Sequence, residues 1–141
     1  MKVETYLQFD GRCEEALDFY RRALGAEVTM MMRFKESPDQ TAITPGSENK
    51  IMHSSFQVGE STVMASDGHC RNAAKYEGFA LTISIPDIAT AEKMFKAVGE
   101  GGRVEMPLTK TFFSPAFGMV ADKFGICWMI MGCVPQEGAC A

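Results

Sequence analysis

The sequence repeats itself, and this repeat restricts the possible folds more than any other feature does. At a constant offset of 76 residues, six apolar or glycine positions of the first half meet matching positions of the second half. The pairs are Leu7 and Ile83, Phe9 and Ile85, Phe19 and Phe95, Gly25 and Gly101, Val28 and Val104, and Met30 and Met106. Such agreement indicates two copies of one structural unit, each packing its apolar residues in the same way.

Each copy begins with a strand, a helix and a second strand. In the first copy, "YLQF" alternates as a half-buried strand does, with Leu7 and Phe9 on one face. Apolar residues then recur at helical spacing from Cys13 to Leu24, and Gly25 is a typical helix stop. The stretch "AEVTMMMRF" predicts the second strand, and residues 79–106 repeat the whole order.

Two further strands follow in each copy. They are predicted at residues 51–58 and 61–67 around Gly59, and at 113–122 and 125–131 around Gly125. Residues 36–50 are rich in Pro, Gly and Ser and predict a long loop. We therefore expect an α+β fold of two tandem βαβββ modules, with curled mixed sheets around a cavity and the helices outside. Residues 1–141 would form one domain, with module one at about 1–76, module two at about 77–134 and a frayed tail at 135–141.

Composition disfavours several kinds of partner. The net charge is −4 and Lys and Arg are scattered, so no basic patch is available for nucleic acid or an anionic membrane. No apolar run reaches membrane-spanning length, and "MKVETYLQFDG" lacks the apolar core of a signal peptide, which predicts a cytoplasmic protein. The five cysteines form no C-x-x-C pair, so we expect reduced, structural thiols.

Four stretches together are similar to a known superfamily. They are "YLQFDGRCEEALDFYRRALGAEV", "MHSSFQVGESTVMASD", "GFALTI" and "FGMVADKFGICWMI". They resemble the vicinal oxygen chelate superfamily, which contains glyoxalase I, bleomycin resistance proteins and extradiol dioxygenases, and within it the PhnB-like group. Some relatives in that group are described as ubiquinone methyltransferases, but the sequence has no glycine-rich strand-to-helix loop to hold a nucleotide-like methyl donor.

The resemblance also indicates where a metal would be bound. Metal-dependent members take His, Glu or Gln ligands from the first and last strands of each module, on the face that lines the cavity. By strand alternation these positions hold Glu4, Tyr6 and Gln8, then Met64, then Ala80, Thr82 and Ser84, and finally Met129. By resemblance a glutamate would stand near Met129, and a thioether is a poor ligand for a hard divalent ion. We expect no metal and no cofactor, with Trp128 packed in the core.

His53 is the strongest candidate for acid or base chemistry. It lies in "IMHSSF", where alternation puts it on one face with Ile51 and Ser55, either buried or lining the cavity. Asp67 ends "MASD"; it either caps the following turn or pairs with His53 as a general base. Gln8 and Tyr6 are alternative partners for His53 in proton transfer.

The aromatic stretch "KTFFSPAFG" supplies further candidates for ligand contact. Phe112, Phe113 and Phe117 either stack on a flat or apolar guest or complete the core. The expected ligand-binding residues are Tyr6, Gln8, His53, Phe112, Phe113 and Met129. We expect a metal-free, homodimeric small-molecule-binding protein. The alternatives are a lyase, isomerase or other enzyme using His53 or an atypically bound divalent metal, and a structural protein whose own Met and Phe side chains fill the cavity.

Overall fold

The computed structural model describes residues 1–41 and 43–133, which form two compact units divided after Ala74. Unit 1 contains β1 (Thr5–Gln8), α1 (Cys13–Leu24), β2 (Glu27–Arg33), the 3-10 turn η1 (Phe34–Glu36), β3 (Ile51–Val58) and β4 (Ser61–Ser66). Unit 2 contains β5 (Leu81–Ile85), α2 (Ile88–Val98), β6 (Arg103–Thr109), β7 (Ala116–Ala121) and β8 (Cys127–Gly132). The tail predicted at 135–141 lies outside the described residues.

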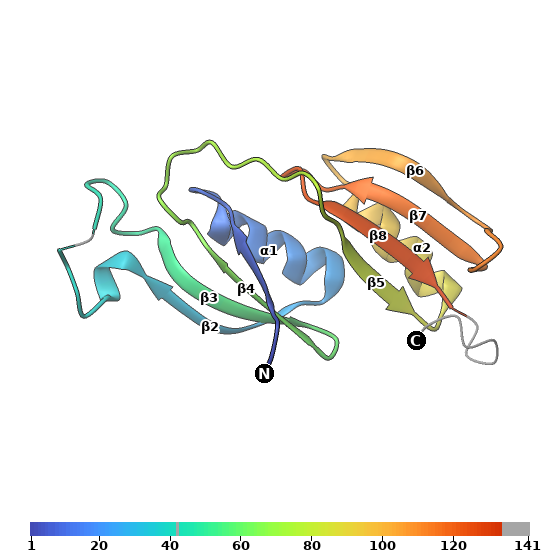
Figure 1. The fold of residues 1–141 in the computed structure, drawn as a ribbon, viewed down its shortest axis with the longest axis horizontal. Helices are drawn as coiled ribbons and strands as arrows, with labels where there is room; N and C mark the ends of the chain where they lie inside the picture. Colours follow the sequence, from blue (N-terminus) through green and yellow to red (C-terminus); the bar gives the residue numbers. More distant parts are fainter. Residues whose placement is uncertain (42, 134–141) are drawn as a thin grey trace. The chain divides into compact units, whose positions relative to one another are not determined.

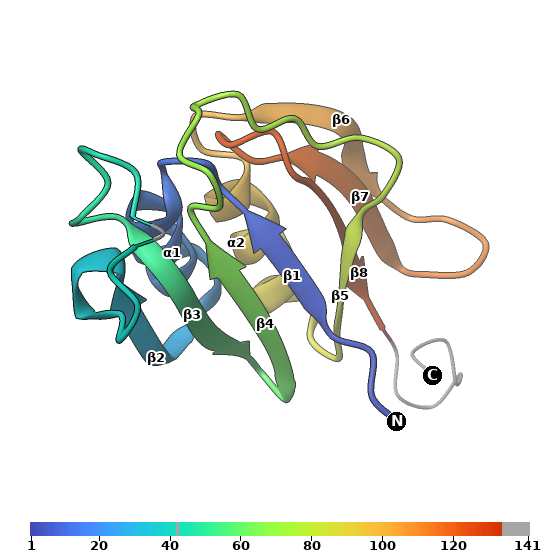
Figure 2. The ribbon, with the colours of Figure 1, turned by 60° about the vertical axis from the view of Figure 1, so that its left-hand side comes forward.

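Each unit is an open, mixed sheet of four strands with its helix against one face (Figure 1). The strand order is β1-β4-β3-β2 in unit 1 and β5-β8-β7-β6 in unit 2. In both units the first and last strands in sequence pair in parallel and the other pairs are antiparallel. Figure 2 shows the four strands of unit 1 side by side. The predicted α+β fold of two βαβββ modules is therefore confirmed.

Helix α1 forms where the apolar spacing predicted it. One face buries six side chains, namely Cys13, Ala16, Leu17, Phe19, Tyr20 and Leu24. The Tyr20 ring stacks on Phe56 of β3, with ring centroids 5.8 Å apart. Gly25 ends the helix in the left-handed conformation, with φ 65°, and its N–H donates to the Tyr20 carbonyl. This conformation favours glycine, which explains the sharp end of the helix.

Helix α2 is capped at its start by a side chain and packs closely on the sheet. The Asp87 carboxylate accepts a hydrogen bond of 3.0 Å from the Thr90 N–H and caps the first turn. On the sheet, Gly118 leaves room for Phe95, because a Cβ atom at residue 118 would lie only 2.7 Å from the Phe95 ring. The missing side chain thus lets α2 approach β7 closely.

Trp128 belongs to the core of unit 2, as predicted. It is 2% exposed, and its indole N–H donates to Asp122 Oδ2 at 2.8 Å. Asp122 Oδ1 accepts the backbone N–H groups of Phe124 and Ile126. One carboxylate oxygen therefore holds the β7–β8 turn, and the other accepts the hydrogen bond of the indole. Both oxygens already accept hydrogen bonds from the protein, so the group is not available for catalysis.

The structure also bears on two further expectations, the state of the cysteines and the absence of membrane-spanning helices. Cys13, Cys70 and Cys127 are free thiols, in line with the expectation for these three residues, and Cys140 lies outside the described residues. Among the described residues, no helix has the length and apolar character needed to span a membrane.

Candidate functional site

The sheet of unit 1 has one face covered by α1 and one face turned away from it. Strand pairing aligns Tyr6 of β1 with Met64 of β4, and Met64 with Ser55 of β3. Their sequence neighbours Leu7 and Phe56 are buried against the helix side. Because side chains alternate along a strand, Tyr6, Met64 and Ser55 share the opposite face. We call this face, with Gln8, Met30 and His53, the Tyr6 face.

Tyr6 and His53 form a hydrogen-bonded pair on this face. The Tyr6 hydroxyl oxygen lies 3.0 Å from His53 Nδ1, and the two rings stack with centroids 5.6 Å apart. Tyr6 is 43% exposed and His53 is half-buried, so solvent and small molecules reach the pair. When the phenol donates to Nδ1, the remaining imidazole nitrogen, Nε2, carries the proton. The pair can therefore offer a directed donor to a ligand.

Gln8 lies two residues beyond Tyr6 on the same face. Its amide oxygen is close to Gly68, where a Cβ atom would stand only 3.0 Å from it. The side chain is exposed. The structure therefore places the predicted residues Tyr6, Gln8 and His53 together on one face of one sheet.

Asp67 does a different job from the one proposed beside His53. Its Oδ1 accepts the N–H groups of Gly11 and Cys13 at 2.8 and 2.7 Å, and its Oδ2 accepts the N–H of Ile51 at 2.7 Å. The residue is 1% exposed. Both carboxylate oxygens are used to fix the start of α1 to β3, on the helix side of the sheet. The geometry does not favour a His53–Asp67 general base.

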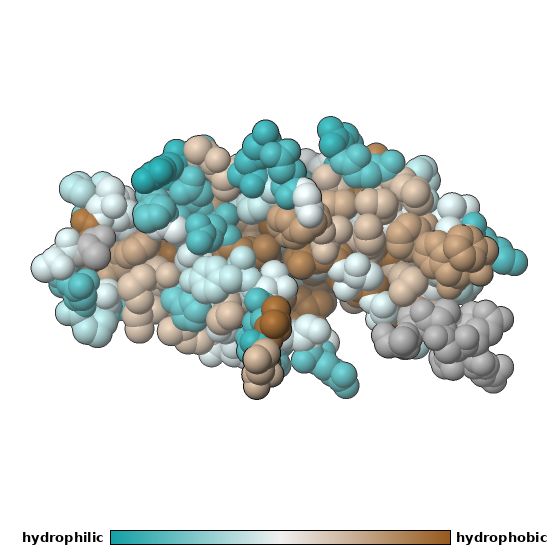
Figure 3. Space-filling model, in the orientation of Figure 1, coloured by the Kyte–Doolittle hydropathy of each residue, from teal (hydrophilic) through white to brown (hydrophobic). Residues whose placement is uncertain are grey.

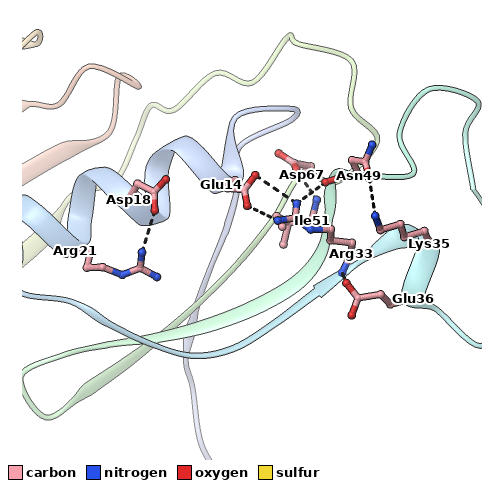
Figure 4. Close-up of polar contacts among 9 residues, drawn as sticks. All are labelled: Glu14, Asp18, Arg21, Arg33, Lys35, Glu36, Asn49, Ile51 and Asp67. Carbon is pink, nitrogen blue, oxygen red and sulfur yellow. Dashed lines mark hydrogen bonds and ion pairs between the residues drawn. The ribbon is translucent and has the colours of Figure 1, made fainter.

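A hollow of about 500 Å³ lies beside the start of α1, lined by charged side chains (Figure 4). Arg33 pairs with Glu14 of α1 and donates to the Asn49 carbonyl at 2.7 Å. The Arg33 hydrogen bond holds the pKa of Glu14 below its usual value. Lys50 donates to the Gly11 carbonyl at 2.8 Å. These partners tie the loop before β3 to the helix, so the charges serve the structure.

Unit 2 presents the matching face, opposite α2. Cross-strand pairing aligns Thr82 with Met129, Met129 with Met119, and Met119 with Met106. A second row aligns Ser84, Met131, Phe117 and Thr109. We call these eight residues the methionine face. The Thr82 hydroxyl lies 3.7 Å from the Met129 sulfur, so the predicted residue Met129 faces away from the helix.

The predicted aromatic residues stand at one end of the methionine face. Phe113 packs edge to face on Phe117 of β7, with ring centroids 5.0 Å apart, and Phe112 packs in the same way on Phe113 at 5.1 Å. Phe112 is fully exposed and Phe113 is 40% exposed. Because both rings are exposed, contact with a ligand is favoured over the alternative that they complete the core.

The two faces correspond position by position. From the parallel strand outward, the row runs Tyr6, Met64, Ser55 and Met30 in unit 1, and Thr82, Met129, Met119 and Met106 in unit 2. Two residues before Ser55 stands His53, and two residues before Met119 stands Phe117. The sequence analysis missed Met119 as a site residue, although its position opposite "CWMIM" across the hairpin carried the signal.

The strand positions where metal ligands were expected hold few side chains that can coordinate a divalent metal. Glu4 is ion-paired with Lys2 at 2.8 Å, and Met64 and Met129 occupy the central positions of the two faces. Within residues 1–41 and 43–133, no three His, Cys, Asp or Glu side chains are grouped as metal ligands would be. The predicted cavity of Tyr6, Gln8, His53, Phe113 and Met129 draws on both units and stays a prediction.

The two βαβββ modules define a class of fold, the vicinal oxygen chelate fold. The fosfomycin resistance protein FosX from Listeria monocytogenes has the same fold, with a TM-score of 0.65 over 96% of both chains at 9% identity. A glyoxalase-related enzyme from Fulvimarina pelagi aligns with a TM-score of 0.61 over 94% of this chain and 88% of its own, at 17% identity.

Within this class the chain belongs to the PhnB-like family. The family described as 3-demethylubiquinone-9 3-methyltransferase matches residues 1–131. Protein YjdN of Escherichia coli is 33% identical over 138 residues, covering 92% of this chain and 94% of YjdN. Protein PA1353 from Pseudomonas aeruginosa is 36% identical, with a TM-score of 0.83 over 94% of this chain and 98% of its own. A Bacillus cereus PhnB protein, described as a putative 3-demethylubiquinone-9 3-methyltransferase, is 25% identical, with a TM-score of 0.78 over 94% and 100%.

Proposed function

We propose that this chain binds a small molecule without the help of a divalent metal, and that Tyr6 and His53 contact the ligand. The observation that carries the proposal is the hydrogen bond of 3.0 Å between these two side chains on an accessible sheet face. Ligand sites combine a mostly apolar lining with a few placed polar groups. Met30 and Met64 provide such a lining beside the pair.

In unit 1, Gln8 is a further proposed ligand contact beside Tyr6 and His53. In unit 2, taken by itself, the proposed contacts are Phe112, Phe113 and Met129. Gln8 adds an amide that both donates and accepts hydrogen bonds. The phenylalanines and Met129 add apolar surface without charge. The proposed setting of the protein is the cytoplasm, which fractionation of cells producing it would test.

The metal-free part of the proposal rests on the chemistry of the side chains. Thioethers stand at the centre of both faces, and thioethers bind zinc, nickel or iron(II) weakly in comparison with His or carboxylate groups. Elemental analysis of the purified protein is expected to find no stoichiometric divalent metal. One tightly held zinc, nickel or iron ion per chain, bound through these strands, would overturn this part of the proposal.

A thermal-shift screen of small molecules, followed by calorimetric titration, tests the ligand site. A ligand at a hundred times its dissociation constant adds about 2.7 kcal/mol to the free energy of unfolding. His53→Ala is expected to weaken binding of any hit while it changes the stability of the free protein by under about 1 kcal/mol, because a half-exposed ring has few packing partners. His69→Ala is the matched control, since His69 is exposed and outside the Tyr6 face. A hit unaffected by His53→Ala would contradict the proposed site.

An enzyme using His53 as acid or base is the second candidate, and the same hydrogen bond favours it. The Tyr6 hydroxyl orients the imidazole of His53, and an oriented imidazole can act as a general acid or base. The reaction in this second candidate is that of a lyase, an isomerase or another enzyme of the superfamily. Proton NMR of a bound hit before and after incubation separates the two candidates, because an enzyme releases an altered molecule, even where an isomer has the same mass, and a binding protein returns the molecule unchanged.

Methyl transfer is not part of the proposal, despite the description of the family. The connection from β1 to α1 spans residues 9–12 and the one from β5 to α2 spans residues 86–87. Neither contains the glycine-rich loop that cradles a nucleotide-like cofactor, and Gly11 is the one glycine in the two connections. Neither of these two connections therefore contains a loop of the kind that binds a nucleotide-like methyl donor.

A further inference from the structure

The methionine face of unit 2 is free of charge. Its eight positions hold four methionines, one phenylalanine and three hydroxyl residues, namely Met106, Met119, Met129, Met131, Phe117, Thr82, Ser84 and Thr109. None of the eight is fully buried. In the view of Figure 1, α2 lies behind β7 and β8. Figure 3 has the same orientation and shows apolar side chains gathered over these two strands, on the face opposite the helix.

The aromatic rings extend this face beyond the sheet. Phe113 and Phe117 meet at an interplanar angle of 71°, and Phe112 and Phe113 at 83°. In such edge-to-face pairs the face of one ring is left open beside the edge of its neighbour. A planar aromatic guest can join the series by the same geometry, which is more favourable than a parallel sandwich.

Methionine sulfur adds a second preference for aromatic rings. Thioether–aromatic contacts are favourable at a sulfur-to-ring distance of about 5 Å, and the flexible side chain adapts to the outline of a guest. Met119 and Met129 are directly paired across β7 and β8, next to Phe117 and Met131 in the adjoining row. The thioethers and the phenylalanine therefore form one continuous surface.

Hydroxyl groups border this surface on β5. Thr82 and Ser84 are exposed, and they align with Met129 and Met131 respectively. A ring lying over the methionines would bring a neutral oxygen substituent toward these hydroxyls, which both donate and accept hydrogen bonds. A carboxylate or ammonium group would find no opposite charge among the eight positions and would lose hydration without compensation.

We infer that the methionine face, with Phe113 beside it, binds a planar, uncharged aromatic ring system that carries a neutral oxygen substituent. The inference rests on the proposed function, because it names the chemical class of the ligand. It concerns the sheet face of unit 2 alone.

Calorimetric titration with three probes of similar size tests the inference. The probes are 2-naphthol, its saturated analogue decahydro-2-naphthol, and 2-naphthoate. We expect 2-naphthol to bind about tenfold more tightly than the other two, from one or two added aromatic contacts. The saturated alcohol is at least as apolar, so burial of apolar area alone predicts no preference for the aromatic probe. Equal or stronger binding of the saturated or charged probe would overturn the inference.

Three matched variants locate the binding. Phe113→Leu and Met129→Leu keep an apolar side chain of similar size and remove the ring or the sulfur, so each is expected to weaken 2-naphthol binding several-fold and leave the saturated probe nearly unaffected. Phe95→Leu is the control, because Phe95 belongs to α2 on the other side of the sheet. Unchanged 2-naphthol affinity in both test variants would overturn the inference.

Failure of this inference can be distinguished from failure of the proposed function. If a screened ligand binds in a His53-dependent way while 2-naphthol shows no preference, the aromatic assignment is overturned and the proposed function is supported. If no small molecule binds the protein at all, both are overturned.

Discussion

At the scale of single residues, Asp67 carries an unusual share of the structure. Its two oxygens accept hydrogen bonds from three backbone N–H groups that belong to the β1–α1 loop, to α1 and to β3. Hydrogen bonds to a charged group contribute about 1.5–3 kcal/mol each, and a buried donor left without an acceptor costs a similar amount. One side chain thus stabilises the junction of a helix and a strand.

Asp67→Asn is expected to lower the free energy of unfolding by about 3 kcal/mol, because the amide offers one acceptor atom and turns a donor toward the remaining N–H groups. Urea unfolding measures the change. Asp18→Asn is the matched control in the same unit, where an exposed pair with Arg21 predicts a loss of under about 1 kcal/mol. Equal losses in the two variants would contradict the role assigned to Asp67.

The role of Asp67 shows where sequence reasoning stops. One of the two predicted roles for Asp67 was to cap the turn that follows it. The residue does have a structural role, but two of its three hydrogen-bond partners lie 54 and 56 positions away in the sequence. Alternation along β1 placed Tyr6 and Gln8 on the face opposite α1, because that property is local to one strand. The hydrogen bond between Tyr6 and His53 crosses β4, and no local pattern reports it.

Cys13 is expected to make stability depend on alkaline pH. Burial raises the pKa of its thiol to about 12, whereas a cysteine in an unfolded chain has a pKa near 8.5. Above about pH 9 the unfolded chain loses this proton and the folded chain keeps it, so the free energy of unfolding falls as pH rises.

Urea unfolding in reducing buffer between pH 8 and 10.5 measures this fall. The decline should be steeper in the natural protein than in Cys13→Ala, by up to about 1.4 kcal/mol per pH unit. Cys127→Ala, at a partly exposed thiol, should change the slope less. Parallel curves for the natural protein and Cys13→Ala would show that the buried thiol does not control the dependence.

At the scale of elements, the repeat predicted the order of helices and strands in both units. It did so because the two copies share the same order of strand and helix patterns, and the first strand of each buries a matched residue, Phe9 in one and Ile85 in the other. One local expectation is wrong: Ile51 is fully buried, while His53, two residues later, contacts Tyr6 on the other face. The pairing of β2 with β3 shifts register between Met32 and Arg33, and such an irregularity interrupts simple alternation.

The end of α1 gives a prediction for a single backbone position. Gly25 has φ 65°, and a Cβ atom there would meet nothing within 4 Å, so Gly25→Ala changes conformational strain and no packing. We expect a loss of about 1 kcal/mol in the free energy of unfolding, measured in urea. Gly25→Asn should cost less, because asparagine tolerates the left-handed conformation better. A smaller loss for alanine than for asparagine would contradict the assignment.

At the scale of the whole molecule, the open edges of the sheets bear on assembly. β2 and β6 are edge strands, and β6 exposes Val104 by 50% and Met106 by 40%. Unpaired strand edges with exposed apolar side chains are surfaces that proteins usually cover. A second copy of the chain is the proposed cover.

Sedimentation velocity at micromolar concentration is therefore expected to show a homodimer. A specific dimer buries about 1,200–2,000 Å² in total, enough to cover an edge strand and its neighbours. Raising the ionic strength should leave an apolar association intact. A monomer at all accessible concentrations would show that the edges are tolerated without a partner.

The three N–H groups gathered by Asp67 have a consequence for hydrogen exchange. The amides of Gly11, Cys13 and Ile51 share one acceptor group, so opening that releases one of them loosens the others. In deuterium oxide they should therefore exchange as one cooperative group, although Gly11 belongs to a loop and Ile51 to a strand. The slowest-exchanging part of unit 1 would then include a loop amide that its local sequence would place among the fastest.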